Sequence, residues 1–479
     1  MKRFIKSILV IFLVVVTTTA CDDFLTVEPE GELLKEDFWK TTEDVEAALA
    51  AMYNALQSST DENLIWGELR ADLHTVSLSD YASIAESNIT PSNGAISWSH
   101  YYNTINLANT LMYFDKQVFG NDATFTKELM DQVDAEAMFV RALNHFYLVR
   151  LWNEVPLVNE PSISDTSSIF LAKSTEKEVL NFLIEDLTKA KDMAIADIDV
   201  KGRANKYSIM SLLADIYLWD EQYQNASDYC DSVMMAGYSL QPYESYFDLY
   251  YPGNSPSESI FEIQFNEALY EESNPIYGSL IPVSGTKQFT TNQYEVNELL
   301  NGNDIRSLEP YTPGNPNSVN KYSVINMFSG INRTTAEEDA NFIYYRYADI
   351  ILIKAEALNE LGGHEVEVNE LLTLTKERAG ITHSIINGIS ELRVEILDER
   401  AREFLAEGKR WFDVLRYSKR ENFSNKDLIV QIILEGVGVQ QQAILSAYVY
   451  DTLSYYLPIP ENEILYNPNL VQNSFYNKY

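Results

Sequence analysis

Charged residues recur at helical spacing along residues 399–416, ERAREFLAEGKRWFDVLR, on both sides of a glycine. Before Gly408 three glutamates recur every four residues, and after it three charged residues recur every three residues. Either spacing gathers charges on one face of a helix, where opposite charges can pair. The segment therefore predicts two charged helices that meet at Gly408. The positions that we expect to form this network are Glu399, Arg400, Glu403, Glu407, Arg410, Asp413 and Arg416.

The charged segment has two interpretations, a catalytic cluster of carboxylates or a partly buried network of ion pairs. Cleavage of a glycosidic bond needs two carboxyl groups about 5 to 9 Å apart across a cleft. Carboxylates that alternate with arginines on one helix are mostly neutralised, so their pKa values are lowered rather than raised. We therefore interpret the segment as a structural network that locks two helices together across Gly408.

The first twenty residues have the composition of a secretory signal, with three basic residues before an apolar run at residues 8–16. That run is too short to span a bilayer. It is followed by Ala20 and Cys21, which resemble the lipobox of bacterial lipoproteins, whose cysteine is acylated and anchored in a membrane. An ordinary cleaved signal with an incidental cysteine is the alternative. We expect residues 1–20 to be a lipoprotein signal peptide and residues 21–40 to be a tether acylated at Cys21.

The composition is that of a globular protein, with 46% hydrophobic and 22% charged residues. Loss of the signal would remove three positive charges and take the formal net charge from −36 to −39. Such a chain is a poor partner for nucleic acid, because phosphate binding needs patches of Lys and Arg. If Cys21 is acylated, Cys230 stands alone and a disulfide framework is excluded.

Metal and nucleophile motifs are missing from the sequence. The five histidines show no metal-ligand spacing, and no nucleophile or phosphate-binding motif occurs. We therefore predict no cofactor and no defined metal site. The acidic composition leaves open a calcium site made of carboxylates and carbonyls, although no position indicates one.

Apolar residues recur with a helical period over much of the chain, which predicts a mainly α fold for a single domain of residues 41–479. Two helical hairpins are expected at residues 206–235 and 343–379, and the small residues of the first fall as in a tetratricopeptide repeat. Long loop-rich segments between the helices usually carry function. The helical scaffold is expected at about 41–57, 98–236 and 340–417, and irregular ligand-facing parts at about 58–97 and 237–336, with one strand at 259–265.

Several motifs in this chain resemble those of the SusD/RagB family of outer-membrane nutrient-binding lipoproteins. The most distinctive is the segment 399–416, with its EG-x-RW-x-D-x-x-R core. Phe404 stands where the family commonly has Leu, and Ser474 to Tyr476 replace its usual Pro-Gly-Tyr ending. Further matches lie at residues 98–109, 136–156 and 346–359, and at the C-terminal residues 458–473.

The resemblance implies a scaffold of tetratricopeptide-like helical pairs, and a loop-rich, irregular part that presents a site for a glycan or another nutrient. It also implies a partner, a SusC-like TonB-dependent transporter barrel over which such a protein closes like a lid. Asp22 and Asp23 directly after Cys21 are similar to surface-export signals of these lipoproteins. The expected location is therefore the outer face of the outer membrane, with a lipid anchor.

Candidate ligand contacts follow from the chemistry of sugars, which need aromatic ring faces with amide or carboxyl groups beside them. The chain has 31 tyrosines and 6 tryptophans, more than a core needs. Every candidate also has an interpretation as a core residue. The candidates are Trp66, Asp72 and Trp98 in the first half of the chain, and Asn292, Tyr294 and Tyr322 in the second loop-rich part.

The first functional hypothesis is a non-enzymatic cell-surface protein that captures oligosaccharides and delivers them to a transporter. The alternative is a repeat-scaffold lipoprotein of the outer membrane that binds peptides or proteins, which helical hairpins also allow. A glycan-cleaving enzyme is disfavoured, because the sequence has no isolated pair of carboxylates of the kind that such enzymes use.

Overall fold

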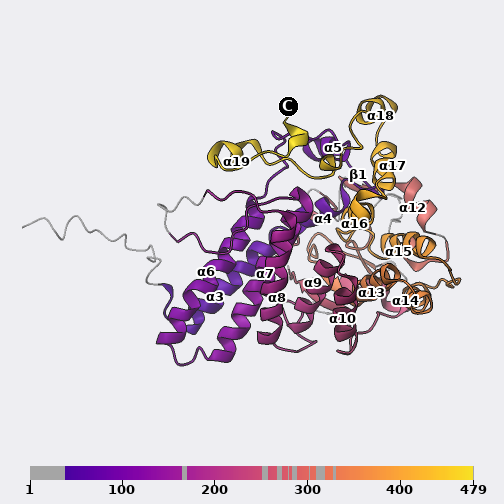
Figure 1. Ribbon diagram of the computed structural model, residues 1–479. Helices are drawn as coiled ribbons and strands as arrows, with labels where there is room; N and C mark the ends of the chain where they lie inside the picture. The colour runs from indigo at the N-terminus through magenta and orange to yellow at the C-terminus, as the bar shows by residue number, and fades with distance from the viewer. Residues whose placement is uncertain are drawn as a thin grey trace, which may run out of the picture.

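The structure, a computed structural model, is mainly helical, as the sequence predicts (Figure 1). Helices form most of the fold, and the described strands form three two-stranded antiparallel sheets. The expected acylation site, Cys21, lies outside the described residues. The structure describes residues 38–163, 170–250, 257–266, 272–278, 280–282, 288–300, 302–308, 319–326 and 331–477.

Four long helices lie side by side at one end of the molecule (Figure 1). Local capping fixes where three of them begin: Thr41 and Asp44 form a capping box at the first helix, and Thr175 and Glu178 form one at the fourth. The Thr126 side chain accepts a hydrogen bond from the first turn of the third. These helices are α3 (Thr42–Gln57), α6 (Ser99–Asn121), α7 (Lys127–Trp152) and α8 (Glu176–Met193).

Two helical hairpins continue the row, and each helix packs against the next. The hairpin predicted at residues 343–379 is wrong in its first part, because Phe342–Arg346 forms strand β6 and pairs with β2 (Ser259–Ile263). An apolar run this short does not distinguish a strand from a helix. The hairpins are α9 (Lys206–Trp219) with α10 (Tyr223–Met234), and α13 (Tyr347–Leu361) with α14 (Glu365–Arg378).

The expectation that residues 58–97 are irregular throughout is corrected by the structure. They include helix α4 (Thr60–Glu68), almost all of which is buried, followed by strand β1 (His74–Val76) and helix α5 (Ser79–Ala85). β1 pairs antiparallel with β3 (Phe289–Thr291), so the two segments predicted to face a ligand meet in one small sheet.

The remaining elements complete the second half of the molecule, and the C-terminal segment crosses the upper end of the helices (Figure 1). In the part of the chain that the structure describes, no helix is long and apolar enough to cross a membrane. The remaining helices are α12 (Gln293–Leu299), α15 (Ile389–Glu403), α16 (Arg410–Phe423), α17 (Asp427–Glu435), α18 (Val439–Leu445) and α19 (Glu461–Tyr466). The short 3-10 turns are η1 (Tyr243–Tyr250), η2 (Pro275–Tyr277), η3 (Ile305–Leu308), η4 (Thr452–Tyr455) and η5 (Ser474–Tyr476). Strand β4 (Val324–Asn326) pairs with β5 (Ile331–Asn332).

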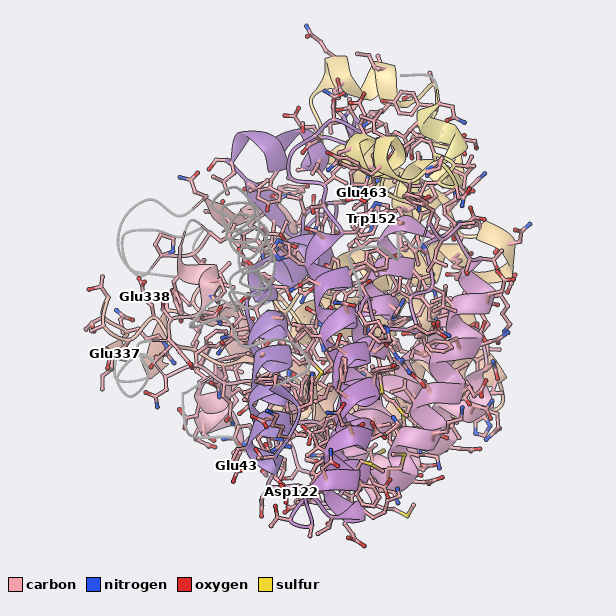
Figure 2. All side chains as sticks on the ribbon, turned by 90° about the vertical axis from the view of Figure 1, so that its left-hand side faces the viewer. Glu43, Asp122, Trp152, Glu337, Glu338 and Glu463 are labelled. Carbon is pink, nitrogen blue, oxygen red and sulfur yellow. The ribbon has the colours of Figure 1, made fainter. Side chains whose placement is uncertain are left out.

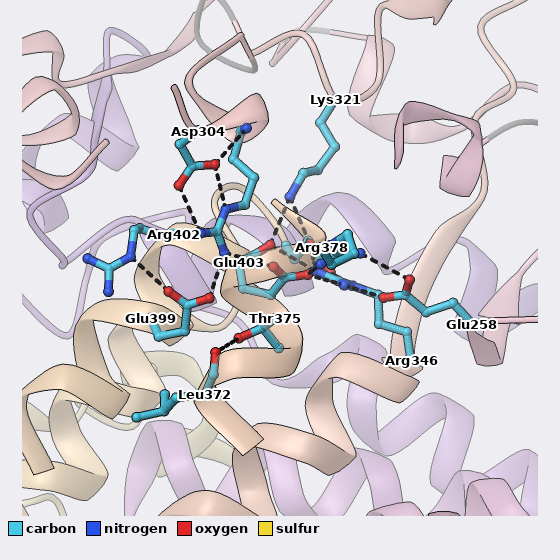
Figure 3. A network of polar contacts seen from close by, with 12 residues as sticks. Glu258, Asp304, Lys321, Arg346, Leu372, Thr375, Arg378, Glu399, Arg402 and Glu403 are labelled. Atoms are coloured by element: carbon cyan, nitrogen blue, oxygen red, sulfur yellow. Dashed lines mark hydrogen bonds and ion pairs between the residues drawn. The ribbon is translucent and has the colours of Figure 1, made fainter. Parts of the chain in front are cut away.

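Glu403 lies at the centre of a buried network of ion pairs (Figure 3). Its carboxylate contacts guanidinium groups from three different elements, Arg306 of η3 at 2.9 Å, Arg346 at the end of β6 at 2.5 Å, and Arg378 of α14. Burial alone would raise the pKa of Glu403, but these cations outweigh it and hold the pKa well below the ordinary value of 4.5. The network therefore joins α15 to the loop-rich part and to the second hairpin.

The other six residues predicted to form the network are also buried, but the predicted pairing across Gly408 is only a small part of it. Arg400 and Asp413 pair across the glycine at 2.9 Å. Most partners come from outside the segment, because the two helices meet other elements as well as each other. The pairs are Glu399 with Arg306, Glu407 with Arg346 and Lys321, Arg410 with Asp72, and Arg416 with Glu356 and Asp413.

A second buried group of charges gives the fold a pH dependence. Asp115 of α6 is buried beside Asp134 of α7, and burial followed by repulsion from Asp134 raises the pKa of Asp115 from 3.8 to about 8. Between these values the folded chain keeps a proton that the unfolded chain has lost, so its stability falls as the pH rises.

We expect Asp115→Asn to remove this dependence, because the amide stays neutral. The free energy of unfolding of the variant should exceed that of the wild type near pH 8, and the difference should vanish near pH 4, as measured by urea unfolding across the range. Asp131→Asn, at a partly exposed position on α7, is the control. A difference that is independent of pH would contradict the assignment.

Candidate functional site

A cleft of about 220 Å³ opens where the loop after α4 meets α5, α12 and α17, and we call it the α12 cleft. It brings together the two segments that the sequence predicts to face a ligand. Both polar and apolar side chains line it. The lining includes Arg70, Asp72, His74, Thr75, Val76, Glu86, Asn292, Glu295, Ile432, Ile433 and Glu435.

Asp72 enters the cleft with its carboxylate already paired. Both oxygens accept hydrogen bonds from Arg410, at 2.9 and 2.8 Å. Burial raises the pKa of Asp72, but the adjacent guanidinium outweighs burial and the pKa is lowered. Asp72 is therefore a fixed hydrogen-bond acceptor and a poor proton donor, and it links the cleft to the charged network.

Asn292, the residue before α12, lies next to Asp72, and Tyr294 is the second residue of the helix. The Asn292 side-chain amide donates to the backbone carbonyl of Asp72 at 3.1 Å, and its backbone N–H donates to Leu73 at 2.7 Å. Tyr294 is 72% exposed. Asp72 and Asn292 thus meet in the cleft, whereas the exposed Tyr294, two residues after Asn292, is not part of its lining.

His74 is a cleft residue that the sequence analysis did not single out as a contact. Its ring stacks on Phe289 with centroids 4.6 Å apart, and its Nδ1 lies 3.1 Å from Glu68. The Nε2 atom is buried and has no hydrogen-bond partner among the described residues. Its position two residues after Asp72 was the only signal in the sequence. That signal was weak, because a lone histidine is more often part of a core.

The mouth of the cleft is acidic. Glu295 of α12 has a raised pKa, through burial first and then through the charges of Asp72 and Glu435. The cations nearby are already engaged, since Arg70 donates to the backbone carbonyls of Ser454 and Tyr455 and Arg410 holds Asp72. This arrangement suits uncharged hydroxyl groups better than an anionic ligand.

The structure corrects two of the predicted contacts. Trp66 is 1% exposed and lies in α4, inside the core. Tyr322 is also 1% exposed, and its hydroxyl donates to the backbone carbonyl of Ala406. Polar neighbours in the sequence suggested exposure for both. In the structure, however, Trp66 is part of the buried helix α4, and Tyr322 is bonded to the turn before α16. Neither ring has a face to offer to a ligand.

Trp98, the sixth candidate, is separate from the α12 cleft. It is 3% exposed, and its ring borders a pocket at the start of α6.

Among the residues that the structure describes, no group of three or more His, Cys, Asp or Glu side chains is placed to hold a metal ion.

Comparison with known proteins places this architecture in one family. A family model described as the SusD family matches residues 213–476, more than half of the chain. A second model, described as "Starch-binding associating with outer membrane", matches residues 23–218. The chain belongs to the SusD family.

Individual relatives agree with this assignment. SusD-like protein P38 of Formosa agariphila is 29% identical over 88% of this chain and 93% of its own length. A solved structure described as a laminarin-binding SusD-like protein has a TM-score of 0.70 and 23% identity, over 91% of this chain and 99% of that one. A SusD superfamily protein from Bacteroides vulgatus has a TM-score of 0.76 and 20% identity, over 91% and 99%. At these identities the structural matches establish the fold.

Proposed function

We propose that this protein is a non-enzymatic glycan-binding lipoprotein of the outer cell surface. It captures oligosaccharides and delivers them to a SusC-like TonB-dependent transporter. The observation that carries the proposal is the α12 cleft, where Asp72 and Asn292 meet, with the exposed Tyr294 two residues further along the chain. A ring face beside fixed hydrogen-bonding groups is the arrangement that sugar binding needs.

Family membership supports the partner and the location. One matched family model is described by starch binding and association with the outer membrane, and one structural neighbour is described as binding laminarin. Acylation at Cys21 would keep the protein close to a transporter in the same membrane and raise the local concentration of both. A large β-barrel that co-purifies from detergent-solubilised outer membrane is the expected result, and its absence from a native preparation would contradict the delivery role.

The charges of the cleft support binding without hydrolysis. The Asp72 carboxylate is held by Arg410 and its pKa is lowered, so it is unsuited to donate a proton to a leaving group. Incubation of the purified protein with candidate polysaccharides should release no oligosaccharides or reducing ends. Release of products, lost in Glu295→Gln, would make the protein an enzyme.

Tyr294→Ala tests the ligand site directly. Loss of the exposed ring should weaken binding of a glycan by about fivefold to tenfold, from about 1 kcal/mol of lost stacking. Stability should be unchanged, because the side chain is 72% exposed. A panel of soluble neutral oligosaccharides, titrated by calorimetry, provides the measurement. Tyr450→Ala, at another exposed tyrosine, is the matched control. Equal affinities for a bound glycan in all three proteins would exclude Tyr294 as a ligand contact.

A further inference from the structure

A second polar groove, separate from the α12 cleft, lies where the start of α6 meets the loop before α8 and the C-terminal helix α19. Figure 1 shows α19 and α12 on opposite sides of the molecule, and Figure 2 shows Glu463 of α19 near Trp152, at the end of the bundle opposite Glu43 and Asp122. Two pockets of about 420 and 390 Å³ share Glu463 and form what we call the α19 groove. The larger pocket is lined by Trp98, Ser99, Tyr102, Asn103, Asn106, Pro156, Val158, Ser162, Leu171, Glu463, Asn467 and Leu470.

Hydrogen bonds to the backbone hold the walls of the groove in place. The Tyr102 hydroxyl donates to the carbonyl of Pro156 at 2.8 Å. The Asn106 side-chain oxygen accepts from the backbone N–H of Ser162, also at 2.8 Å, and the Asn467 side chain donates to the carbonyl of Leu171 at 2.9 Å. Three segments distant in sequence are thus joined around the groove, which is formed before any ligand arrives. A preformed site loses less conformational entropy when it binds.

Polar groups that the fold does not use face this groove. The Trp98 side chain is 3% exposed, and its indole N–H, which has no hydrogen bond within the described residues, is not among the buried polar atoms, so it reaches the surface of the groove. The amide nitrogen of Asn106 and the carboxylate of Glu463 likewise have no partner in the described part of the chain. By contrast, the indole N–H groups of Trp152 and Trp219 donate to Pro458 and Glu176. The Trp98 N–H is therefore open to the groove and can donate a hydrogen bond to a hydroxyl group there.

The lining defines the chemistry of the ligand. It contains no Lys or Arg among the described residues, and Glu463 would repel an anion. The same carboxylate affects Tyr102. Burial is the main cause that raises the pKa of Tyr102, and the charge of Glu463 raises it further. Amides, hydroxyls and two aromatic rings around a preformed groove match an uncharged, polyhydroxylated ring compound.

We infer that the α19 groove is a second binding site for a neutral oligosaccharide, with Trp98, Asn106 and Glu463 as its hydrogen-bonding groups. The class of ligand rests on the proposed function, whereas the position of the site does not. Two sites on opposite sides would let one protein hold two segments of a long chain and gain avidity.

The six tryptophan indole groups give a test that reads this site alone. In ¹⁵N-labelled protein, the Trp98 indole resonance, assigned by its absence from Trp98→Phe, should shift saturably on addition of a laminarin-derived or starch-derived tetrasaccharide. The same titration should show two binding events by calorimetry. Trp98→Phe with Glu463→Ala should remove one of them, with an affinity loss of at least tenfold at that site.

Tyr294→Ala is the matched variant for the other site, and it should leave the Trp98 shift intact. A Trp98 resonance that does not move while Tyr294-dependent binding persists would overturn the second site and leave the proposed function standing. Failure of a full panel of neutral oligosaccharides to bind either site would overturn both. Thermal unfolding of each variant controls for loss of fold, because Phe is smaller than Trp and leaves some space at this nearly buried position.

Discussion

Replacing Glu403 by glutamine is expected to lower the free energy of unfolding by about 3 to 5 kcal/mol. The Glu403 side chain is fully buried, and its charge is shared by Arg306, Arg346 and Arg378. Glutamine keeps the shape but leaves these guanidinium groups without their common counter-charge, and a buried charge without a partner is costly. Unfolding in urea, with comparable denaturant dependence in both proteins, measures the loss.

Glu185→Gln is the matched control, because Glu185 pairs with Lys189 on the surface of α8 with both side chains more than half exposed. A pair of that kind contributes well under 1 kcal/mol. If Glu403→Gln instead kept full stability and lost glycan affinity, the charged segment would be a ligand site, and its interpretation as architecture would be wrong.

The same network sets the response to acid. Burial raises the pKa of Glu407, but Arg346 and Lys321 outweigh burial and lower it from 4.5 to about 2. A lowered pKa means that the carboxylate stabilises the fold above the ordinary value, and that this contribution is lost as the pH falls from about 4.5 to about 2. Acid unfolding of the wild type should fall in this window, and Glu403→Gln should unfold at a higher pH.

Local sequence signals predicted the helices well, because caps and apolar periods are properties of neighbouring residues. The hairpin predicted at residues 206–235 begins where it was expected, at Lys206, the first residue of α9. Helix α4 was missed, because it is buried on almost every side and therefore has no polar face to create a period. Trp66 was misplaced for the same reason.

The partners of the charges were beyond the reach of spacing arguments. The spacing of Glu399, Glu403 and Glu407 indicated one helical face, but their cations come from η3, β6 and α14, which only the tertiary fold brings together. The α12 cleft was predicted in part for a related reason. Asp72 and Asn292 have the chemistry of a site, whereas the contact between them depends on the pairing of β1 with β3.

Gly67→Ala is expected to be at least as damaging as the loss of a buried charge. A Cβ atom at Gly67 would stand 1.7 Å from the backbone oxygen of Gly408 and 2.0 Å from its carbonyl carbon. Backbone atoms cannot turn aside as a flexible side chain can, so α4 and the turn before α16 must move apart. Overpacking of this kind costs about 1 to 3 kcal/mol, and occasionally more.

Separation of the two backbones would also break the contact that closes the turn. A carboxylate oxygen of Glu68 accepts hydrogen bonds from the backbone N–H groups of Gly408 at 2.9 Å and Lys409 at 3.2 Å. Hydrogen bonds to a charged group contribute about 1.5 to 3 kcal/mol each. The total loss should therefore reach about 3 kcal/mol or more, measured as a lower urea midpoint or as loss of soluble protein.

Gly120→Ala is the control for the helical glycine itself. Gly120 lies in α6, and a Cβ atom there would meet nothing within 4 Å. Alanine at an open helical position stabilises by about 0.5 to 1 kcal/mol, so the two substitutions should have opposite signs. Equal small effects would mean that α4 does not press against the turn at Gly408. The charged segment would then owe its position to ion pairs alone, and Glu403→Gln would be the larger of the two losses.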